Sequence, residues 1–184
     1  MVSNLSCVVK SNNQINRDFF LVKTVEVAKN LLRCVLRKRD KGDFLILETE
    51  AYLQNDPASH SFKGKTKRNQ HMFLLGGHTY VYLIYGIHYC FNIVTGKEGV
   101  GEAVLIRSAL DLANNRLIIG PGNVCKELEL NLSHSGVDLL ENPFISLEMT
   151  ETKIKIAATP RVGISKGKDL KYRFLNSEFL RTQP

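Results

Sequence analysis

Residues 79–95, TYVYLIYGIHYCFNIVT, predict two antiparallel strands joined by a tight turn. Tyrosine, valine and isoleucine are enriched in strands, and Gly86 can adopt the left-handed backbone that hairpin turns require. We therefore expect strands at 79–85 and 88–95. Packing of the rings in a core explains most of these tyrosines, but it does not explain a tyrosine at the turn. Tyr85 at a hairpin tip is instead typical of a side chain that projects from the protein to wedge into stacked bases.

The rest of the chain predicts further strands and few helices. Thr24 is expected to cap a short helix with Val27, Ala28, Leu31 and Leu32 on its apolar side, and Gly42 suits the turn of a second hairpin. The other expected elements are strands at 34–39, 44–52, 103–108, 144–149, 153–158 and 172–175 and a helix at 124–130, after a break at 120–122. This pattern predicts an α+β fold, a single domain over residues 1–184 around a curved, mostly antiparallel β-sheet with flanking helices and a protruding β-hairpin. Residues 1–16 are expected to be a loosely ordered N-terminal segment.

Length and composition limit the class of protein. The chain has 184 residues and is 43% hydrophobic, which suits one globular domain and argues against disordered and fibrous classes. We expect no membrane span and no secretory signal, because no apolar run approaches roughly 18 residues and the N-terminus is polar. The four cysteines (7, 34, 90 and 125) are too widely spaced for a disulfide framework or a zinc ribbon. A cytoplasmic location is expected, at the nucleoid in a bacterium, or a nuclear one in a eukaryote.

The positive charge is unevenly distributed. The net charge is +7, with balances of +4 in residues 57–110, −5 in residues 111–151 and +6 in residues 152–184. No acidic residue lies between Pro57 and Lys97, and four of the six tyrosines are in this interval. Cations for phosphates and flat rings for bases are what a nucleic-acid-binding surface needs, although a solvated basic face over a tyrosine-rich core has the same composition.

The strand at 44–52 is apolar but ends in two glutamates and a tyrosine. Because side chains alternate along a strand, Ile46, Glu48, Glu50 and Tyr52 are expected to share one face. A carboxylate that is partly shielded from water can act as a base. The alternative is an exposed strand end with solvated glutamates, and the strand by itself does not decide between them.

Eight short blocks, in order, resemble the alkyladenine (methylpurine) DNA glycosylase family from about residue 17 to 175. They are ETEAY (48–52), SHS (59–61), TKRN (66–69), MF (72–73), TYVYLIYG (79–86) followed by Asn92, VLIRSAL (104–110), GP (120–121) and PRVGI (160–164). The resemblance implies a monofunctional, cofactor-free enzyme of base excision repair that acts on double-stranded DNA. Such an enzyme flips a damaged purine out of the duplex and hydrolyses its N-glycosidic bond. The implied substrates are 3-methyladenine and 7-methylguanine, with hypoxanthine and ethenoadenine as further candidates.

The resemblance also implies a role for each matching residue. Glu50 corresponds to the catalytic glutamate that activates water, and Arg107 to an arginine near that water and the target phosphate. The rings expected to hold the flipped base are Tyr52, His60 and Tyr82. Asn92 corresponds to a pocket-floor residue that excludes the amino group of normal guanine.

The remaining matches concern the duplex. Tyr85 corresponds to the side chain that intercalates in the vacated place. The basic residues expected at the DNA backbone are Lys65, Lys67, Arg68 and Arg161. The family usually has a longer, arginine-rich segment where this chain has only residues 111–119, and a lysine where it has Asn123. Both differences remove phosphate contacts, so weaker or more salt-sensitive binding is expected, with catalysis retained.

Other functions are consistent with part of the pattern. A non-catalytic nucleic-acid-binding domain would use the same basic, tyrosine-rich face, but it gains nothing from Glu50 facing a polyanion. A metal-dependent nuclease would need clustered acids within the basic region, and that region has none. The histidine spacings do not predict a metal site. No lysine lies beside Glu50 in the sequence, so a Schiff-base mechanism is not predicted. We expect a monomer.

Overall fold

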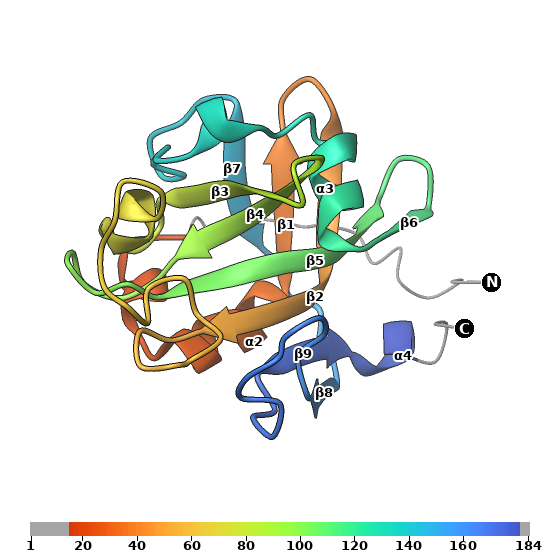
Figure 1. Cartoon of the computed structure of the whole chain (residues 1–184). Coiled ribbons are helices and arrows are strands. Elements are labelled where there is room, and N and C mark those ends of the chain that lie inside the picture. Colours follow the sequence, from red (N-terminus) through yellow and green to blue (C-terminus); the bar gives the residue numbers. More distant parts are fainter. Residues whose placement is uncertain (1–14, 181–184) are drawn as a thin grey trace.

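The computed structural model describes residues 15–180 and shows the predicted α+β fold, a curled antiparallel sheet with short helices and a protruding hairpin (Figure 1). The predicted N-terminal segment 1–16 lies almost entirely outside the described residues. The strands are β1 (Cys34–Lys38), β2 (Gly42–Tyr52), β3 (Thr79–Ile84), β4 (His88–Val94), β5 (Ala103–Asp111), β6 (Arg116–Ile119), β7 (Ile145–Met149), β8 (Ile156–Thr159) and β9 (Arg173–Asn176). The helices are α1 (Asp18–Leu21), α2 (Thr24–Leu31), α3 (Pro121–Glu127) and α4 (Ser177–Leu180), with 3₁₀ turns η1 (Gln70–Phe73) and η2 (Leu132–His134).

The long strand β2 organises the sheet. The strand order is β3-β4-β5-β2-β1-β7, with β6 beside β5 and the β8–β9 pair beside β2. On the side of β2 away from β5, its first residues pair with β1 and its later residues 48–50 pair with β9. Figure 1 shows that β1 and β7 run steeply across the direction of β3, β4 and β5, as the curl of the sheet requires.

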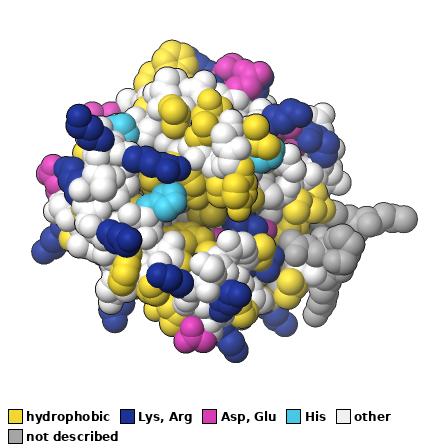
Figure 2. Space-filling model, in the orientation of Figure 1, with side chains coloured by type: hydrophobic (Ala, Val, Ile, Leu, Met, Phe, Trp, Pro, Cys, Tyr) yellow, Lys and Arg dark blue, Asp and Glu magenta, His cyan; other side chains and the backbone are white. Residues whose placement is uncertain are grey.

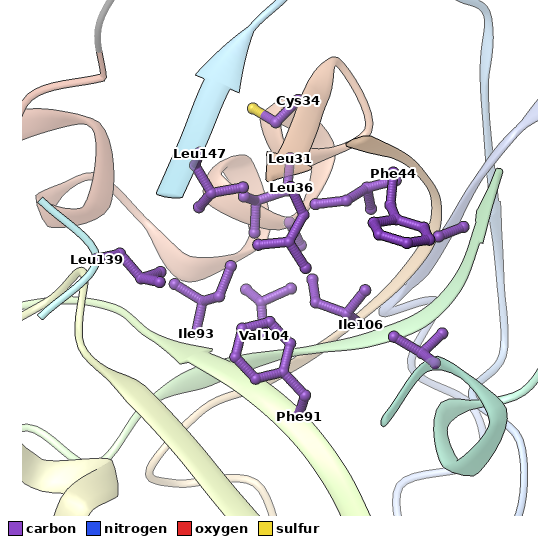
Figure 3. Close-up of a cluster of buried hydrophobic side chains, with 14 of the residues drawn as sticks. Leu31, Cys34, Leu36, Phe44, Phe91, Ile93, Val104, Ile106, Leu139 and Leu147 are labelled. Carbon is purple, nitrogen blue, oxygen red and sulfur yellow. The ribbon is translucent and has the colours of Figure 1, made fainter. Parts of the chain in front are cut away.

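The main core lies between the curled sheet and α2. Val27, Ala28 and Leu31 on α2 are fully buried against it, as the predicted apolar side requires. Figure 3 shows how side chains from α2, β1, β2, β4, β5 and β7 converge there; those it labels are Leu31, Cys34, Leu36, Phe44, Phe91, Ile93, Val104, Ile106, Leu139 and Leu147. These side chains fill the sheet face where it meets α2.

Thr24 does not cap α2, contrary to the prediction. The N-cap is Lys23, which makes no side-chain capping bond, and Thr24 is the first helical residue. The hydroxyl of Thr24 instead hydrogen-bonds to Thr95 at 2.7 Å and donates to Glu102. These partners lie more than 70 positions away, so a buried tertiary contact replaces the local capping bond.

Two opposed β-bulges change the predicted alternation along β2. Ile46 pairs with Ala109 and Glu48 with Ser108, so Leu47 is an extra residue on β2; the next pair, Thr49 with Ile106, leaves Arg107 extra on β5. Ile46 and Ala51 consequently belong to the same core, whereas the carboxylates of Glu48 and Glu50 face Arg107 on the other side. The prediction that Ile46 shares a face with Glu48, Glu50 and Tyr52 was therefore wrong for Ile46, because a bulge reverses the alternation.

The structure also adds or shifts short elements near the chain breaks. Strand β6 and helix α1 were not predicted. Helix α3 begins at Pro121, three residues before the predicted start, since proline suits the first helical position and Gly120 takes a positive φ of 94°. The loop at Gly42, with φ of 110°, confirms the predicted turn between β1 and β2.

Candidate active site

A cavity of about 480 Å³ opens on the sheet face away from α2. It lies between the β3–β4 hairpin, β5 and the loop 162–166, and Figure 2 shows that face hollowed near its centre, with hydrophobic side chains inside and Lys and Arg around it. The structure brings six of the predicted site residues to its lining: Tyr52, His60, Tyr82, Tyr85, Asn92 and Arg107. They come from β2, β3, β4, β5, the turn after β3 and the loop after β2, so only the fold assembles them.

Glu50 lies directly behind the lining of the cavity and is fully buried. Its Oε2 accepts hydrogen bonds from the Tyr52 hydroxyl at 2.8 Å and from Arg107 Nη1 at 3.4 Å, and its Oε1 accepts one from the Val162 backbone N–H at 2.9 Å. All three donors belong to residues that line the cavity. A carboxylate has about four acceptor positions, so Oε1 keeps one for a further donor such as water.

Glu48 holds Arg107 beside Glu50. Its Oε1 accepts hydrogen bonds from Arg107 Nε at 3.0 Å and from Arg173 Nε on β9, and its Oε2 accepts one from the Ser108 hydroxyl. Two carboxylates and two guanidinium groups thus neutralise one another in a buried network. Burial by itself lowers the pKa of Arg107, but the charges of Glu50 and Glu48 outweigh it and raise the pKa above its usual value.

An aromatic wall forms one side of the cavity. The rings of His60 and Tyr82 meet edge to face with centroids 4.5 Å apart, and His60 Nδ1 lies 2.9 Å from the Tyr80 hydroxyl. Burial, together with the charge of Arg68, lowers the pKa of His60, so its ring is neutral at pH 7. Burial raises the pKa of Tyr82, and burial with the charge of Glu50 raises that of Tyr52, so both remain neutral phenols.

Asn92 is buried and lines this cavity. It lies on β4, and its Nδ2 donates to the backbone carbonyls of Tyr80 at 3.0 Å and Cys90 at 3.4 Å. These bonds orient the amide within the hairpin. A rigid polar group at the floor of an aromatic pocket can accept or reject hydrogen-bonding groups of a planar ligand.

The hairpin tip carries exposed apolar side chains, as predicted. Tyr85 is 83% exposed and Ile87 is 72% exposed. Tyr85 has a φ of 53° and Gly86 a φ of 72°, the two positive angles of a type I′ turn, closed by Ile87 N–H donating to the Ile84 carbonyl at 3.2 Å. A positive φ costs about 1–2 kcal/mol at a residue other than glycine, so Tyr85 is kept there at the expense of stability.

The predicted backbone-contacting residues fall into two groups. Lys65, Lys67 and Arg68 are exposed on the loop before η1, and Arg68 Nη2 donates to the Leu83 carbonyl of β3 at 3.2 Å. Arg161, in contrast, is buried: its guanidinium pairs with Asp56, donates to the Ala51 carbonyl at 2.9 Å and lies 4.6 Å above the centre of the Tyr52 ring.

The burial of Arg161 corrects its predicted role. Its side chain and that of Asp56 are 0% and 1% exposed, so this arginine does not reach a phosphate. It holds the loop that follows β8 against the strand end that carries Glu50, and it supports the ring of Tyr52 from behind. Both contacts make Arg161 part of the structural framework of the site.

Several lining residues were not predicted from the sequence. They are Pro57, Ala58, Met72, Tyr80, Ile84, Cys90, Leu105, Pro121, Val162, Gly163, Ile164, Ser165 and Lys166. The block PRVGI (160–164) could have pointed to Val162, Gly163 and Ile164. The side chains of its glycine and valine, however, carry no chemistry that suggests a site. The role of Val162 depends on its backbone N–H, which side-chain patterns do not reveal.

No group of three or more His, Cys, Asp or Glu side chains within residues 15–180 is arranged to hold a metal ion. In the same part of the chain no helix has the length and apolar character needed to cross a membrane.

Comparisons with known proteins agree on one family. The sequence profile described as methylpurine-DNA glycosylase (MPG) matches residues 18–178. A protein of Carboxydothermus hydrogenoformans, named provisionally as a 3-methyladenine DNA glycosylase, is 43% identical over 176 residues, covering 86% of this chain and 92% of the relative. Proteins with the same provisional name are 42% identical in Francisella tularensis (83% and 90% covered) and 41% identical in Ehrlichia ruminantium (89% and 89% covered).

Proposed function

Because this chain belongs to the methylpurine-DNA glycosylase family, we propose that it removes alkylated purines from duplex DNA by hydrolysing the N-glycosidic bond, which starts base excision repair. The observation that supports this most directly is Glu50, a buried carboxylate with three hydrogen bonds, placed behind an aromatic cavity. A protein that only binds nucleic acid would lose affinity by aiming such a group at a polyanion. The proposed substrates are 3-methyladenine and 7-methylguanine, with hypoxanthine and ethenoadenine as further candidates.

The cavity suits a flipped purine. The rings of Tyr52, His60 and Tyr82 line it, and aromatic contacts of about 1–3 kcal/mol each offset the few kcal/mol needed to unstack the base. A methylated purine that carries a positive charge gains extra attraction from the electron-rich ring faces. We propose that Asn92 at the floor disfavours the amino group of normal guanine.

In the proposed reaction, Glu50 activates a water molecule that attacks C1′ of the flipped nucleotide. The water would use the remaining acceptor position of Oε1 and would enter between the lining residues that cover Glu50. The carboxylate also stabilises the positive charge that develops on the sugar. Arg107, held by Glu48, is proposed to lie beside this water and the target phosphate, and its raised pKa keeps it charged.

The hairpin and the basic loop are proposed to hold the opened duplex. Tyr85 fills the space that the flipped nucleotide vacates, and Lys65, Lys67 and Arg68 contact the phosphates. The short segment 111–119 and Asn123 would make this binding more sensitive to salt. One cavity and one hairpin suffice for this cycle, so we propose that the protein acts as a monomer.

A base-release assay with Glu50→Gln tests the proposal. Wild-type protein should release 3-methyladenine and hypoxanthine from duplex DNA, and Glu50→Gln should do so about 10²–10⁴-fold more slowly, because it lacks the base while keeping a similar shape. Binding to the same duplex should not weaken, because the substitution removes a negative charge. Equal release by both proteins, or release by neither, would reject a catalytic Glu50 and favour the binding domain. A covalent adduct trapped by borohydride would reject the water mechanism.

A further inference from the structure

A second cavity, of about 530 Å³, lies on the opposite face of β3. Tyr80, Tyr82 and Ile84 line the first cavity, while Val81 and Leu83, the alternate residues of the same strand, line the second. Tyr82 and Tyr85 border both cavities. Strand β3 is at the edge of the sheet, so this strand and the hairpin tip form a wall between the two cavities.

The second cavity is basic and has an apolar rim. Lys67, Arg68 and His71 line it, and none of the described residues on its lining is acidic. His71 is held in place, since its Nδ1 lies 2.9 Å from the Ser135 hydroxyl and its ring packs against Gly136, where a Cβ would lie 3.2 Å away. Ser135 in turn accepts the Val81 backbone N–H at 3.0 Å. Leu132, 53% exposed, lies on the same lining.

We propose that this second cavity binds the backbone of the DNA strand opposite the lesion. The inference rests on the proposed function: if Tyr85 enters the duplex and the damaged base occupies the first cavity, the lesion strand lies on that side of the hairpin. The strand that retains its stacked base then lies on the other side of the same wall. Lys67, Arg68 and His71 supply donors for one of its phosphates, and Leu132 packs against the adjoining sugar.

Paired substrates separate this contact from those to the lesion strand. The same hypoxanthine-containing strand is used alone and in a duplex, and the rate of excision at subsaturating enzyme is measured for wild type, Lys67→Ala and the matched control Lys63→Ala. Lys63 is exposed on the same loop but lines neither cavity. Lys67→Ala should lower excision from the duplex roughly three- to tenfold more than excision from the single strand, and should reduce the salt slope of duplex binding by about one. Lys63→Ala should affect both substrates equally.

Methylphosphonates in the complementary strand identify the phosphate. Neutralising the contacted phosphate should weaken binding by wild type more than binding by Lys67→Ala, which keeps only the donors of Arg68 and His71. Leu132→Glu should lower duplex excision more than Leu132→Gln, and urea unfolding checks that each variant is folded. Equal losses on single and double strands, or sensitivity only to lesion-strand methylphosphonates, would overturn the second-strand contact while excision by wild type continues. If wild type excises nothing from either substrate, the proposed function itself fails, and this inference with it.

Discussion

The hairpin tip and the end of β2 differ in polarity and in exposure to solvent. At the tip, Tyr85 and Ile87 are apolar and more than 70% exposed. At the end of β2, Glu48 and Glu50 are charged and at most 2% exposed. Each arrangement costs stability, because apolar side chains are normally buried and carboxylates normally solvated. Both regions border the same cavity, and this shared location is what makes a functional explanation stronger than two separate structural ones.

The two regions also differ in what holds them. The carboxylates at the end of β2 are surrounded by donors from β5, β9 and the loop at Val162, so removing one partner leaves others unpaired. At the tip, the described contacts are those of the turn itself, of the paired strands below it, and of Arg68, which donates to the Leu83 carbonyl. Changes in the buried region should therefore lower stability, whereas changes at the tip should lower activity on duplex DNA without lowering stability.

The largest effect on stability is expected in the buried region, from Arg161→Ala. It leaves Asp56 as an unpaired buried charge, so the free energy of unfolding should fall by about 3–5 kcal/mol, measured by urea denaturation. Lys168→Ala, at an exposed position of the same loop, should change it by less than about 0.5 kcal/mol. If Arg161→Ala instead keeps its stability and reduces the salt slope of DNA binding, Arg161 contacts phosphate as the sequence indicated.

A smaller effect is expected at the tip, where the change should raise stability. Tyr85→Asn places Asn-Gly, the favoured pair for a type I′ turn, at two positive φ angles, so the unfolding free energy should rise by about 1 kcal/mol. Excision from duplex DNA should fall about tenfold, because the ring that stacks in the duplex is lost. Denaturation and single-turnover excision measure the two changes. A parallel loss of both would mean that the ring of Tyr85 supports the fold.

The smallest effect concerns His60, which lines the same cavity. Its pKa is lowered by burial and by Arg68, so it becomes protonated only below the usual histidine value. As the pH falls through that range, affinity for a cationic purine should drop about fivefold, since two like charges near 4 Å in water-like surroundings repel by roughly 1 kcal/mol. Affinity for neutral hypoxanthine should not change in this way. Binding titrations with His60→Gln provide the control, and a pH dependence retained by that variant would assign the proton elsewhere.

Local patterns predicted part of the candidate site, and the roles expected of His60, Asn92 and Arg107 came only from the family resemblance. The hairpin, its exposed Tyr85 and the strand that ends in Glu50 and Tyr52 follow from residue type and period-two alternation. The bulges at Leu47 and Arg107 could not be predicted, because a bulge depends on how two strands register across more than 50 residues. Arg161 was placed wrongly for a similar reason: a basic loop residue has the same sequence pattern whether it reaches a phosphate or a buried aspartate.

The sequence by itself determined most of the strands, the uneven charge and the residue types found at the candidate site, because these depend on side-chain chemistry and on periodicity along the chain. Only the tertiary structure decided which face of β2 each glutamate takes, that Arg107 is shared between Glu48 and Glu50, and that a second basic cavity lies behind β3. These features arise from contacts between residues far apart in the chain. Their geometry depends on strand register and on the curl of the sheet, which no local pattern encodes.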